Sequence, residues 1–299
     1  MGEGVVTTDG FNMDTRIEPQ TGIQAEEQED RGTALKALQL ASINMLRRTV
    51  EAMARRRPRA GAVHVDLEDG CLGFGGADLP LSRAVGIATS RPVTGEEVAA
   101  IESFYASRGS TTRFTISPRT DHSLVEILEA CGYRKGIETK NWFVPLEESM
   151  IVAPDPEIEV VEVSPDEEDL WARHVGAGFA EQNAPADITD IPARTLDMFY
   201  CLGFAEGATP LLARRGGEIV GGAVLHVYGG IASLRTCSTR IASRNNGVQS
   251  ALIAARLRIA IERGCSIAFS STEANAASAR NLCRFGFAPL SYTHVMWKN

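Results

Sequence analysis

The stretch RNNGVQSALI, residues 244–253, joins a run of short apolar segments to a helical pattern that continues to Arg263. A helix begins with backbone N–H groups that have no partner inside the helix, and the helix dipole adds a partial positive charge there. Gly247 lets the backbone come close to an anion, and residues 239–261 contain four arginines and no acidic residue. The stretch therefore predicts a phosphate-binding helix N-terminus. An ordinary capped helix beside scattered arginines is the alternative.

The elements around this stretch predict a layered α/β (α+β) unit. Antiparallel strands come first and strand–helix alternation follows, which is typical of a mixed sheet covered by helices. In chain order, we expect a strand at 158–163, a helix begun by a Ser164–Glu167 capping box, strands at 209–215 and 218–227, a third strand ending near Ser238, a helix at 246–263, a strand at 266–271, a helix at 276–285 and a strand through Val295.

The same order of elements occurs earlier in the chain, which indicates an internal duplication. Cys131-Gly132-Tyr133 and Phe285-Gly286-Phe287 occupy equivalent places in the two halves. The earlier elements are a helix from Thr33 to Pro58, strands at 62–66 and 83–88, a helix at 94–105, a strand at 112–117, a helix at 121–130 and a strand at 137–145. We expect a polar tail (1–31) and two domains (32–150 and 151–299), with few contacts across the boundary.

Composition excludes several classes of protein. The chain has 299 residues, 44% hydrophobic and 23% charged, with a net charge of −8, which is typical of a globular protein and opposes a polyanionic partner. Arginines at 47–59 could bind nucleic acid, but cations at a helix C-terminus are favoured in any case. Six cysteines form no CxxC pair, so we expect neither a metal site nor disulfides, as in a cytoplasmic protein. No apolar run is long enough to span a membrane. We therefore expect neither nucleic acid nor membrane as a partner.

Residues 244–253, together with Asn275, the run 278–282 and Phe285-Gly286-Phe287, resemble the GNAT superfamily of acetyl-CoA-dependent N-acetyltransferases. Gln249 stands where that family's loop has a small residue. The resemblance implies two GNAT-like domains, each a mixed, mostly antiparallel sheet flanked by helices, with acetyl-CoA bound by the second. The cofactor-binding residues that it implies are Cys237, Ser238 and Thr239 for the pantetheine arm, Arg244, Asn245, Asn246, Gly247, Val248, Gln249 and Ser250 for the pyrophosphate, and Asn275, Ser278 and Asn281 beside it.

The implied reaction is attack by a neutral amine on the thioester carbonyl, which needs a base and donors for the oxyanion. Many family members place a tyrosine acid where this chain has Leu282, so Tyr292 is the nearest alternative phenol in sequence. The candidates for the base are Glu181, Asp187, His226 and Glu273. Phe179 with Glu181, Asp187 and Asp190 would suit a cationic, small-molecule amine.

The first copy lacks an equivalent anion site. Pro92 has no N–H group, and Glu96 and Glu97 place carboxylates at the helix start where the pyrophosphate would lie. We therefore expect one acetyl-CoA per chain. The expected function is N-acetyl transfer to a small amine, with a catalytically silent acyl-CoA-binding sensor or scaffold as the alternative. Both a monomer and a homodimer remain open.

Overall fold

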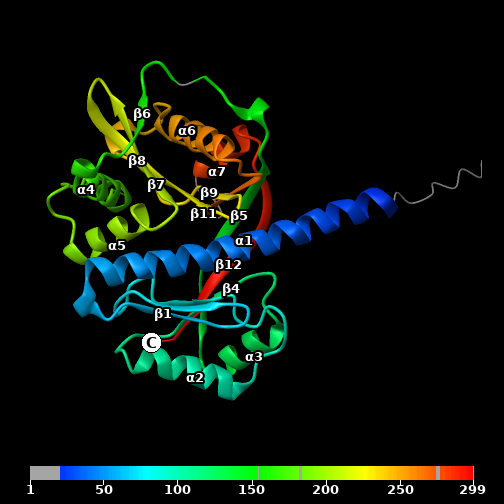
Figure 1. Ribbon diagram of the computed structural model, residues 1–299. Helices are drawn as coiled ribbons and strands as arrows, with labels where there is room; N and C mark the ends of the chain where they lie inside the picture. Colours follow the sequence, from blue (N-terminus) through cyan, green and yellow to red (C-terminus); the bar gives the residue numbers. More distant parts are fainter. Residues whose placement is uncertain (1–20, 154, 182–183, 274–276, 299) are drawn as a thin grey trace, which may run out of the picture.

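The computed structural model describes residues 21–153, 155–181, 184–273 and 277–298, and their strands form one continuous mixed sheet (Figure 1). The strand order is β1-β2-β3-β4-β12-β5-β11-β9-β8-β7-β6, and β10 pairs with β8 beside this path. The strands are β1 (Val63–Asp66), β2 (Cys71–Phe74), β3 (Arg83–Val85), β4 (Arg113–Ile116), β5 (Arg134–Pro145), β6 (Glu159–Glu162), β7 (Ala208–Arg215), β8 (Glu218–Tyr228), β9 (Ile231–Ser233), β10 (Cys237–Thr239), β11 (Ile267–Glu273) and β12 (Ala288–Trp297).

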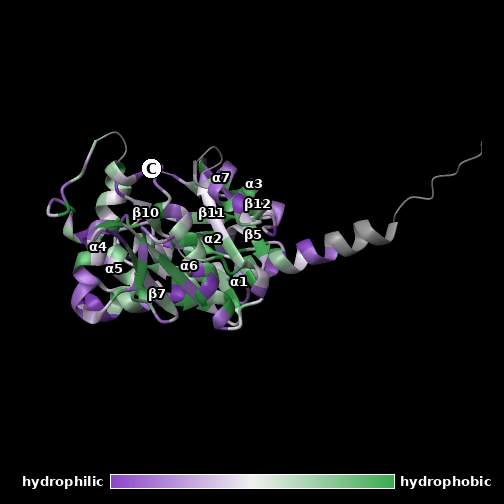
Figure 2. Ribbon diagram, turned by 90° about the horizontal axis from the view of Figure 1, so that it is seen from above, coloured by the Kyte–Doolittle hydropathy of each residue, from purple (hydrophilic) through white to green (hydrophobic). Residues whose placement is uncertain are grey.

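Helices cover both faces of this sheet. They are α1 (Thr21–Arg56), α2 (Gly95–Ala106), α3 (His122–Ala130), α4 (Glu168–Ala180), α5 (Ala193–Gly203), α6 (Val248–Glu262) and α7 (Ala277–Arg284). Helices α1, α4 and α5 pack on one face, whereas α2, α3, α6 and α7 pack on the other. Successive residues of a strand point to opposite faces, so the same strands contribute side chains to both layers. The apolar strands lie in the interior of the molecule (Figure 2). The predicted mixed α/β architecture is confirmed.

The two halves exchange their last strands. β12, from the end of the chain, pairs with β4 of the first half, while β5 of the first half pairs with β11 of the second. The exchanged strands β5 and β12 also pair with each other, antiparallel, in the middle of the sheet. The expectation that few contacts cross the boundary at residues 150/151 is therefore wrong, since hydrogen bonds between β4 and β12 and between β5 and β11 join strands from its two sides. The division of the chain into two domains there stays a prediction.

The ends of α3 and α7, which the predicted duplication makes equivalent, have the same local structure. Gly132 and Gly286 both have left-handed backbone, with φ of 81° and 78°. In α3 the N–H of Tyr133 donates to the carbonyl of Leu128, and in α7 the N–H of Phe287 donates to the carbonyl of Leu282 in the same arrangement. Each helix therefore ends with the same glycine-dependent motif before its exchanged strand.

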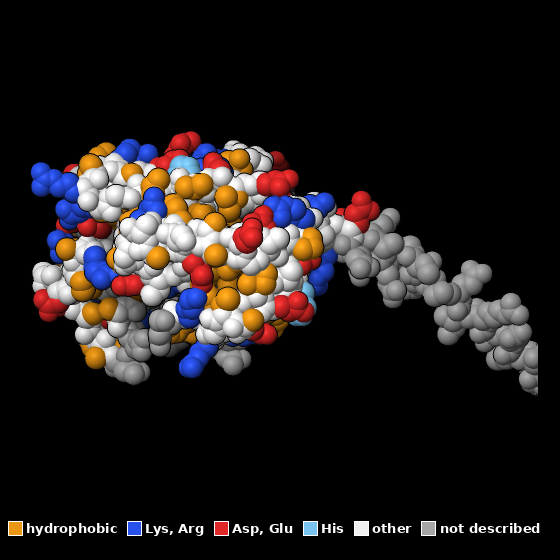
Figure 3. Space-filling model, turned by 90° about the horizontal axis from the view of Figure 1, so that it is seen from below, with side chains coloured by type: hydrophobic (Ala, Val, Ile, Leu, Met, Phe, Trp, Pro, Cys, Tyr) orange, Lys and Arg blue, Asp and Glu red, His pale blue; other side chains and the backbone are white. Residues whose placement is uncertain are grey.

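Helix α1 connects the two halves. It begins at Thr21, so residues 21–31 of the predicted polar tail are helical, while residues 1–20 lie outside the described part of the chain. Leu46 and Val50 pack on the first-half strands, whereas Met53 contacts the cluster that includes Cys201 of α5. No helix in the described residues is both long enough and apolar enough to cross a membrane. Seen from below, the surface mixes basic and acidic side chains among exposed apolar ones (Figure 3).

Local patterns predicted most elements but missed β2 and α5. The capping box of α2 is confirmed: Thr94 Oγ1 accepts from the N–H of Glu97 at 3.3 Å, and Glu97 Oε2 accepts from the N–H of Thr94 at 2.8 Å. The second predicted capping box is wrong. Ser164 donates its hydroxyl to Glu167 and does not cap a backbone group, and a short 3₁₀ turn (Pro165–Glu167) precedes α4.

We expect Gly203→Ala to destabilise the second half. Gly203 ends α5 against the fully buried Trp171, and an added Cβ would lie 2.4 Å from Trp171 Cζ3. Overpacking of this kind costs about 1–3 kcal/mol, and urea unfolding measures it. The control is Gly95→Ala, where a Cβ meets nothing within 4 Å and stability should change by less than about 1 kcal/mol. Equal unfolding midpoints for the two variants would contradict the prediction.

Candidate functional site

The third predicted strand of the second half, expected to end near Ser238, is divided into two strands, β9 and β10. β9 pairs with β11 as far as Ser233, and the N–H of Leu234 donates to the carbonyl of Phe269 at 2.7 Å. Thr236 then takes a positive φ of 51°, and β10 continues with β8 as its only strand partner in the described residues. β10 and β11 therefore separate, and one edge of β10 is left without a neighbouring strand.

The open edge of β10 presents backbone hydrogen-bonding groups. The carbonyl of Thr236 and the N–H of Arg240 bond to β8, on either side of β10. Because bonding directions alternate along an antiparallel strand, the N–H and carbonyl groups of Cys237 and Thr239 point away from β8. Cys237, Ser238 and Thr239 were predicted to pair with an extended ligand, and this pairing stays a prediction. The carbonyl of Thr239 also accepts from Arg244 Nε at 3.4 Å.

The loop after β10 leads into the N-terminus of α6. A 3₁₀ turn (Ile241–Ser243) comes first, and Asn245 and Gly247 then take positive φ values of 63° and 80°. The N–H of Ala251 donates to the carbonyl of Gly247, so the N–H groups of residues 248–250 precede the first bond inside the helix. The first turn contains no acidic residue. The helix therefore places no carboxylate of its own at the positive end of its dipole, and Asp155, from outside the helix, is the carboxylate that lies near Gly247.

A cleft of about 750 Å³ lies where β10, this loop, α7 and the end of α4 meet. Most of the predicted cofactor-binding residues line it: Cys237, Ser238, Thr239, Arg244, Asn245, Gly247, Val248, Gln249, Ser250, Ser278 and Asn281. Asn246 does not line the cleft, and its carbonyl accepts from Arg215 at 2.7 Å. Asn275 lies outside the described residues.

The sequence reasoning missed Gly178, Ser243, Arg280 and Arg284, which also line the cleft. Arg280 and Arg284 are exposed and four residues apart on α7, so they share one face of that helix. This spacing was the signal that could have identified them. They add positive charge on the side of the cleft opposite α4.

Several predicted side chains are held by bonds within the protein. Asn281 donates to the side-chain oxygen of Gln249 at 2.6 Å, which links α7 to the first turn of α6. Arg244 donates to the carbonyls of Gly178 and Glu181 at the end of α4. Its guanidinium thus satisfies carbonyls at a helix C-terminus, where cations are stabilising.

The structure gives Glu181 a structural role and not that of a free base. Its side chain is fully buried, and it accepts bonds from Arg240 at 2.7 Å, from the N–H of Ile241 at 2.6 Å and from the N–H of Ala186 at 3.2 Å. Burial opposes ionisation, but the bonds from Arg240 and the two N–H groups hold the pKa of Glu181 below its ordinary value. Glu181 therefore fixes the loop before α6 to the end of α4.

The acidic group predicted to hold an amine is not assembled. The carboxylate of Asp187 accepts from the N–H and hydroxyl of Thr189, and neither Asp187 nor Asp190 lines the cleft. Phe179 does line it, 49% exposed and stacked on Phe199. Glu273, at the end of β11, is the acidic side chain of the cleft that has no ion pair among the described residues.

His226 lies on the face of the sheet covered by α1, outside the cleft, so the structure places this base candidate elsewhere. Its Nε2 atom is buried and has no hydrogen-bond partner in the described part of the chain. Burial, with smaller contributions from Arg235 and Arg48, lowers the pKa of His226 to about 4. The imidazole is therefore neutral in the folded protein at neutral pH.

We expect His226 to make the fold sensitive to acid. The pKa of His226 rises from about 4 in the folded state to its ordinary 6.5 on unfolding, so the unfolded chain binds more protons between these values. The contribution of His226 to the free energy of unfolding is therefore fully present above pH 6.5. It decreases by about 3 kcal/mol in total as the pH falls toward 4. Urea unfolding of His226→Gln across this range should lack that part of the decline, whereas His122→Gln, at an 80% exposed side chain, should keep it. Identical pH profiles for wild type and His226→Gln would refute the assignment.

The phenol candidate Tyr292 also lies outside the cleft. It is 47% exposed on β12, beside a separate groove that includes Arg31 and Glu138. Leu282, where the resemblance described above implies a tyrosine in many family members, is 3% exposed in the core that includes residues of α6. Leu128 is equally buried at the equivalent place in α3, so a leucine here anchors the helix to the sheet. Among the described residues, no tyrosine lines the cleft.

The start of α2, at the equivalent place in the first half, carries negative charge. Glu97 belongs to the capping box and also accepts from Arg91 at 2.7 Å. The bond from Arg91, together with the backbone bond from Thr94, lowers the pKa of Glu97 to about 2. An ionised carboxylate thus occupies this helix N-terminus, as the sequence analysis expected, whereas the first turn of α6 contains no acidic residue.

The chain is similar to known proteins in part of its sequence and in its fold. The family model described as the acetyltransferase (GNAT) family matches residues 179–287. A GCN5-related N-acetyltransferase from Kribbella flavida is 17% identical with a TM-score of 0.61, over 88% of this chain and 95% of that one. One from Sphaerobacter thermophilus is 18% identical, with a TM-score of 0.53 over 86% and 91%. A tandem GNAT protein from the clavulanic acid biosynthesis pathway is 15% identical, with a TM-score of 0.57 over 84% and 87%. No functionally curated protein matches the chain.

Proposed function

We propose, from the match of residues 179–287 to the GNAT acetyltransferase family model, that the chain transfers the acetyl group of acetyl-CoA to a primary amine of a small molecule. The observation that carries the proposal is the cleft that joins the open edge of β10 to the acid-free first turn of α6. An extended pantetheine arm would pair with the carbonyl of Cys237 and the N–H of Thr239, and the pyrophosphate would accept from the N–H groups of residues 248–250.

The positive rim of the cleft supports a nucleotide ligand. Arg280 and Arg284 are exposed at this rim, where their guanidinium groups could form ion pairs with the phosphates of CoA. Glu181 does not oppose this charge, because its carboxylate is already bound by Arg240.

Within this proposal, Glu273 is the base that receives the ammonium proton. It lies in the cleft with an exposed side chain and no ion pair among the described residues, whereas Glu181 is fully bonded and His226 lies elsewhere. The neutral amine then attacks the thioester carbonyl, the C–N bond forms and the C–S bond breaks, and the proton that the nitrogen loses converts the leaving CoA thiolate into the free thiol. The outward N–H group of Cys237 is the candidate oxyanion donor.

Two measurements test the proposal. Calorimetric titration with acetyl-CoA should give about one equivalent bound per chain, and a panel of primary amines should release free thiol when acetyl-CoA is present. Binding without thiol release from any amine would favour the second candidate, a silent acyl-CoA-binding protein, which the lack of a tyrosine among the described cleft residues also favours. No binding at all would overturn both functions.

A further inference from the structure

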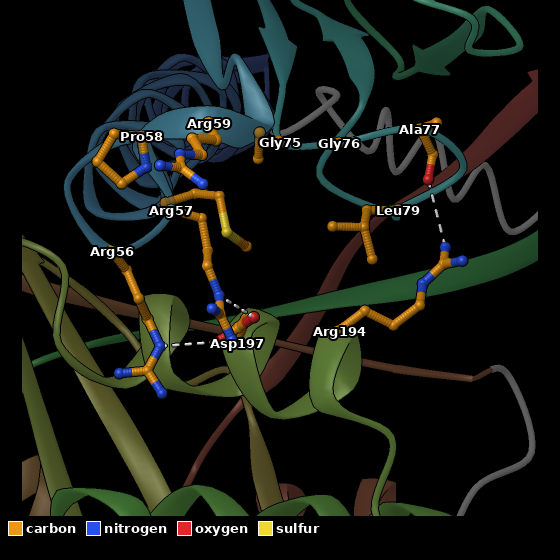
Figure 4. A pocket seen from close by; sticks show the side chains of 12 residues that line it. Arg56, Arg57, Pro58, Arg59, Gly75, Gly76, Ala77, Leu79, Arg194 and Asp197 are labelled. Carbon is orange, nitrogen blue, oxygen red and sulfur yellow. Dashed lines mark hydrogen bonds and ion pairs between the residues drawn. The ribbon is translucent and has the colours of Figure 1, made fainter.

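A second cavity, of about 720 Å³, lies at the junction of the two halves, away from the cleft (Figure 4). Its walls are the C-terminal end of α1 with the residues after it, the connection between β2 and β3, and the start of α5. Met53 and Leu79, which are 2% and 9% exposed, supply an apolar surface. The cavity exists only because α1 brings parts of both halves together.

One carboxylate in this cavity serves two arginines. Arg56 and Arg57 donate to the two oxygens of Asp197 at 2.8 and 2.7 Å, and both point toward it in Figure 4. Asp197 is 7% exposed, and although burial opposes ionisation, the two arginines hold its pKa below the ordinary value. Arg56 also stacks 3.7 Å from the ring centre of Tyr200. These two guanidiniums are thereby fixed in place, and their paired charge is only half neutralised.

Two further arginines line the cavity without a carboxylate partner in the described residues. Arg59 follows α1, and Arg194, at the start of α5, donates to the carbonyl of Ala77 at 3.3 Å. Four arginines and one aspartate give the cavity lining a charge of +3, in a chain whose net charge is −8. The dipole of α1 accounts for cations at its own C-terminus, but it does not account for Arg194, which comes from a different helix.

We propose that this cavity binds a small organic anion. A carboxylate or phosphate group is held by Arg59 and Arg194, and an apolar portion lies against Met53 and Leu79. Arginine suits both anions because its planar donors match their oxygen atoms. The site is separate from the acetyl-CoA cleft and does not depend on the function proposed for it.

Methyl NMR of protein labelled with [methyl-¹³C]methionine tests this directly, because Met53 reports on the cavity and Met53→Leu assigns its signal. The probes are phenyl phosphate and phenylacetate, with benzyl alcohol as the neutral analogue, each titrated to about 10 mM with and without acetyl-CoA. At least one anion should shift the Met53 signal with saturation, and added salt should weaken the effect. A shift by only one of the two anions identifies the preferred headgroup.

The double variant Arg59→Glu/Arg194→Glu should bind the anion at least about tenfold more weakly. Its matched control, Arg280→Glu/Arg284→Glu, reverses two exposed charges in the acetyl-CoA cleft and should leave the Met53 response unchanged. If the charge-reversed protein does not fold, Arg59→Gln/Arg194→Gln makes the same comparison. A Met53 signal that no anion moves, that benzyl alcohol moves equally, or that responds equally in the folded variant would overturn the proposal.

Discussion

Ser250→Glu is expected to weaken the binding of acetyl-CoA by about 100-fold or more, because it puts a carboxylate among the N–H groups proposed to hold the pyrophosphate. Ser250 is the third residue of α6 and lines the cleft. A glutamate at this position is favourable for the helix itself, since it complements the dipole and can bond back to the N-cap. The loss of binding should therefore occur without loss of stability, and calorimetry combined with thermal unfolding separates the two effects.

The matched control for this variant is Ser250→Gln, which has nearly the same shape and no charge. We expect Ser250→Gln to bind acetyl-CoA within about fivefold of wild type. Equal affinities for the two variants would show that the N-terminus of α6 does not contact the phosphates. A substitution at Gly247 is a poorer test, because a Cβ there would point at Asp155 and Ile158, neither of which lines the cleft.

Glu273→Gln is expected to lower the rate of acetyl transfer by roughly 10²–10⁴-fold, the range typical for removal of a general base. The affinity for acetyl-CoA should stay within about twofold, since the amide keeps the size of the side chain. The measurement is thiol release at saturating acetyl-CoA, as a function of pH, with the best amine of the panel.

Asp187→Asn is the control for Glu273→Gln, because it removes a carboxylate that was also a candidate but lies outside the cleft. Its activity should stay within about threefold of wild type. If Glu273→Gln retains similar activity, another group accepts the proton and the assignment of Glu273 is wrong.

The sequence by itself determined most helices, most strands and the position of the loop that precedes α6. These features depend on residues a few positions apart, such as the capping pair Thr94 and Glu97 and the left-handed glycines that end α3 and α7. Local bonds of this kind form in the same way wherever the segment lies in the fold. For the same reason, residues 244–250 could be identified as a helix N-terminus without acidic residues.

Only the tertiary structure decided which distant residues meet. The exchange of β5 and β12 depends on backbone hydrogen bonds between strands far apart in the chain. Any two strands with compatible faces can form such bonds, so the sequence of a strand does not identify its partner. The role of Glu181 depends likewise on Arg240, and the cavity charge depends on Arg194 lying opposite the end of α1. A charged side chain gives no local sign of its partner, because its partner is selected by packing of the whole molecule and not by its neighbours in sequence.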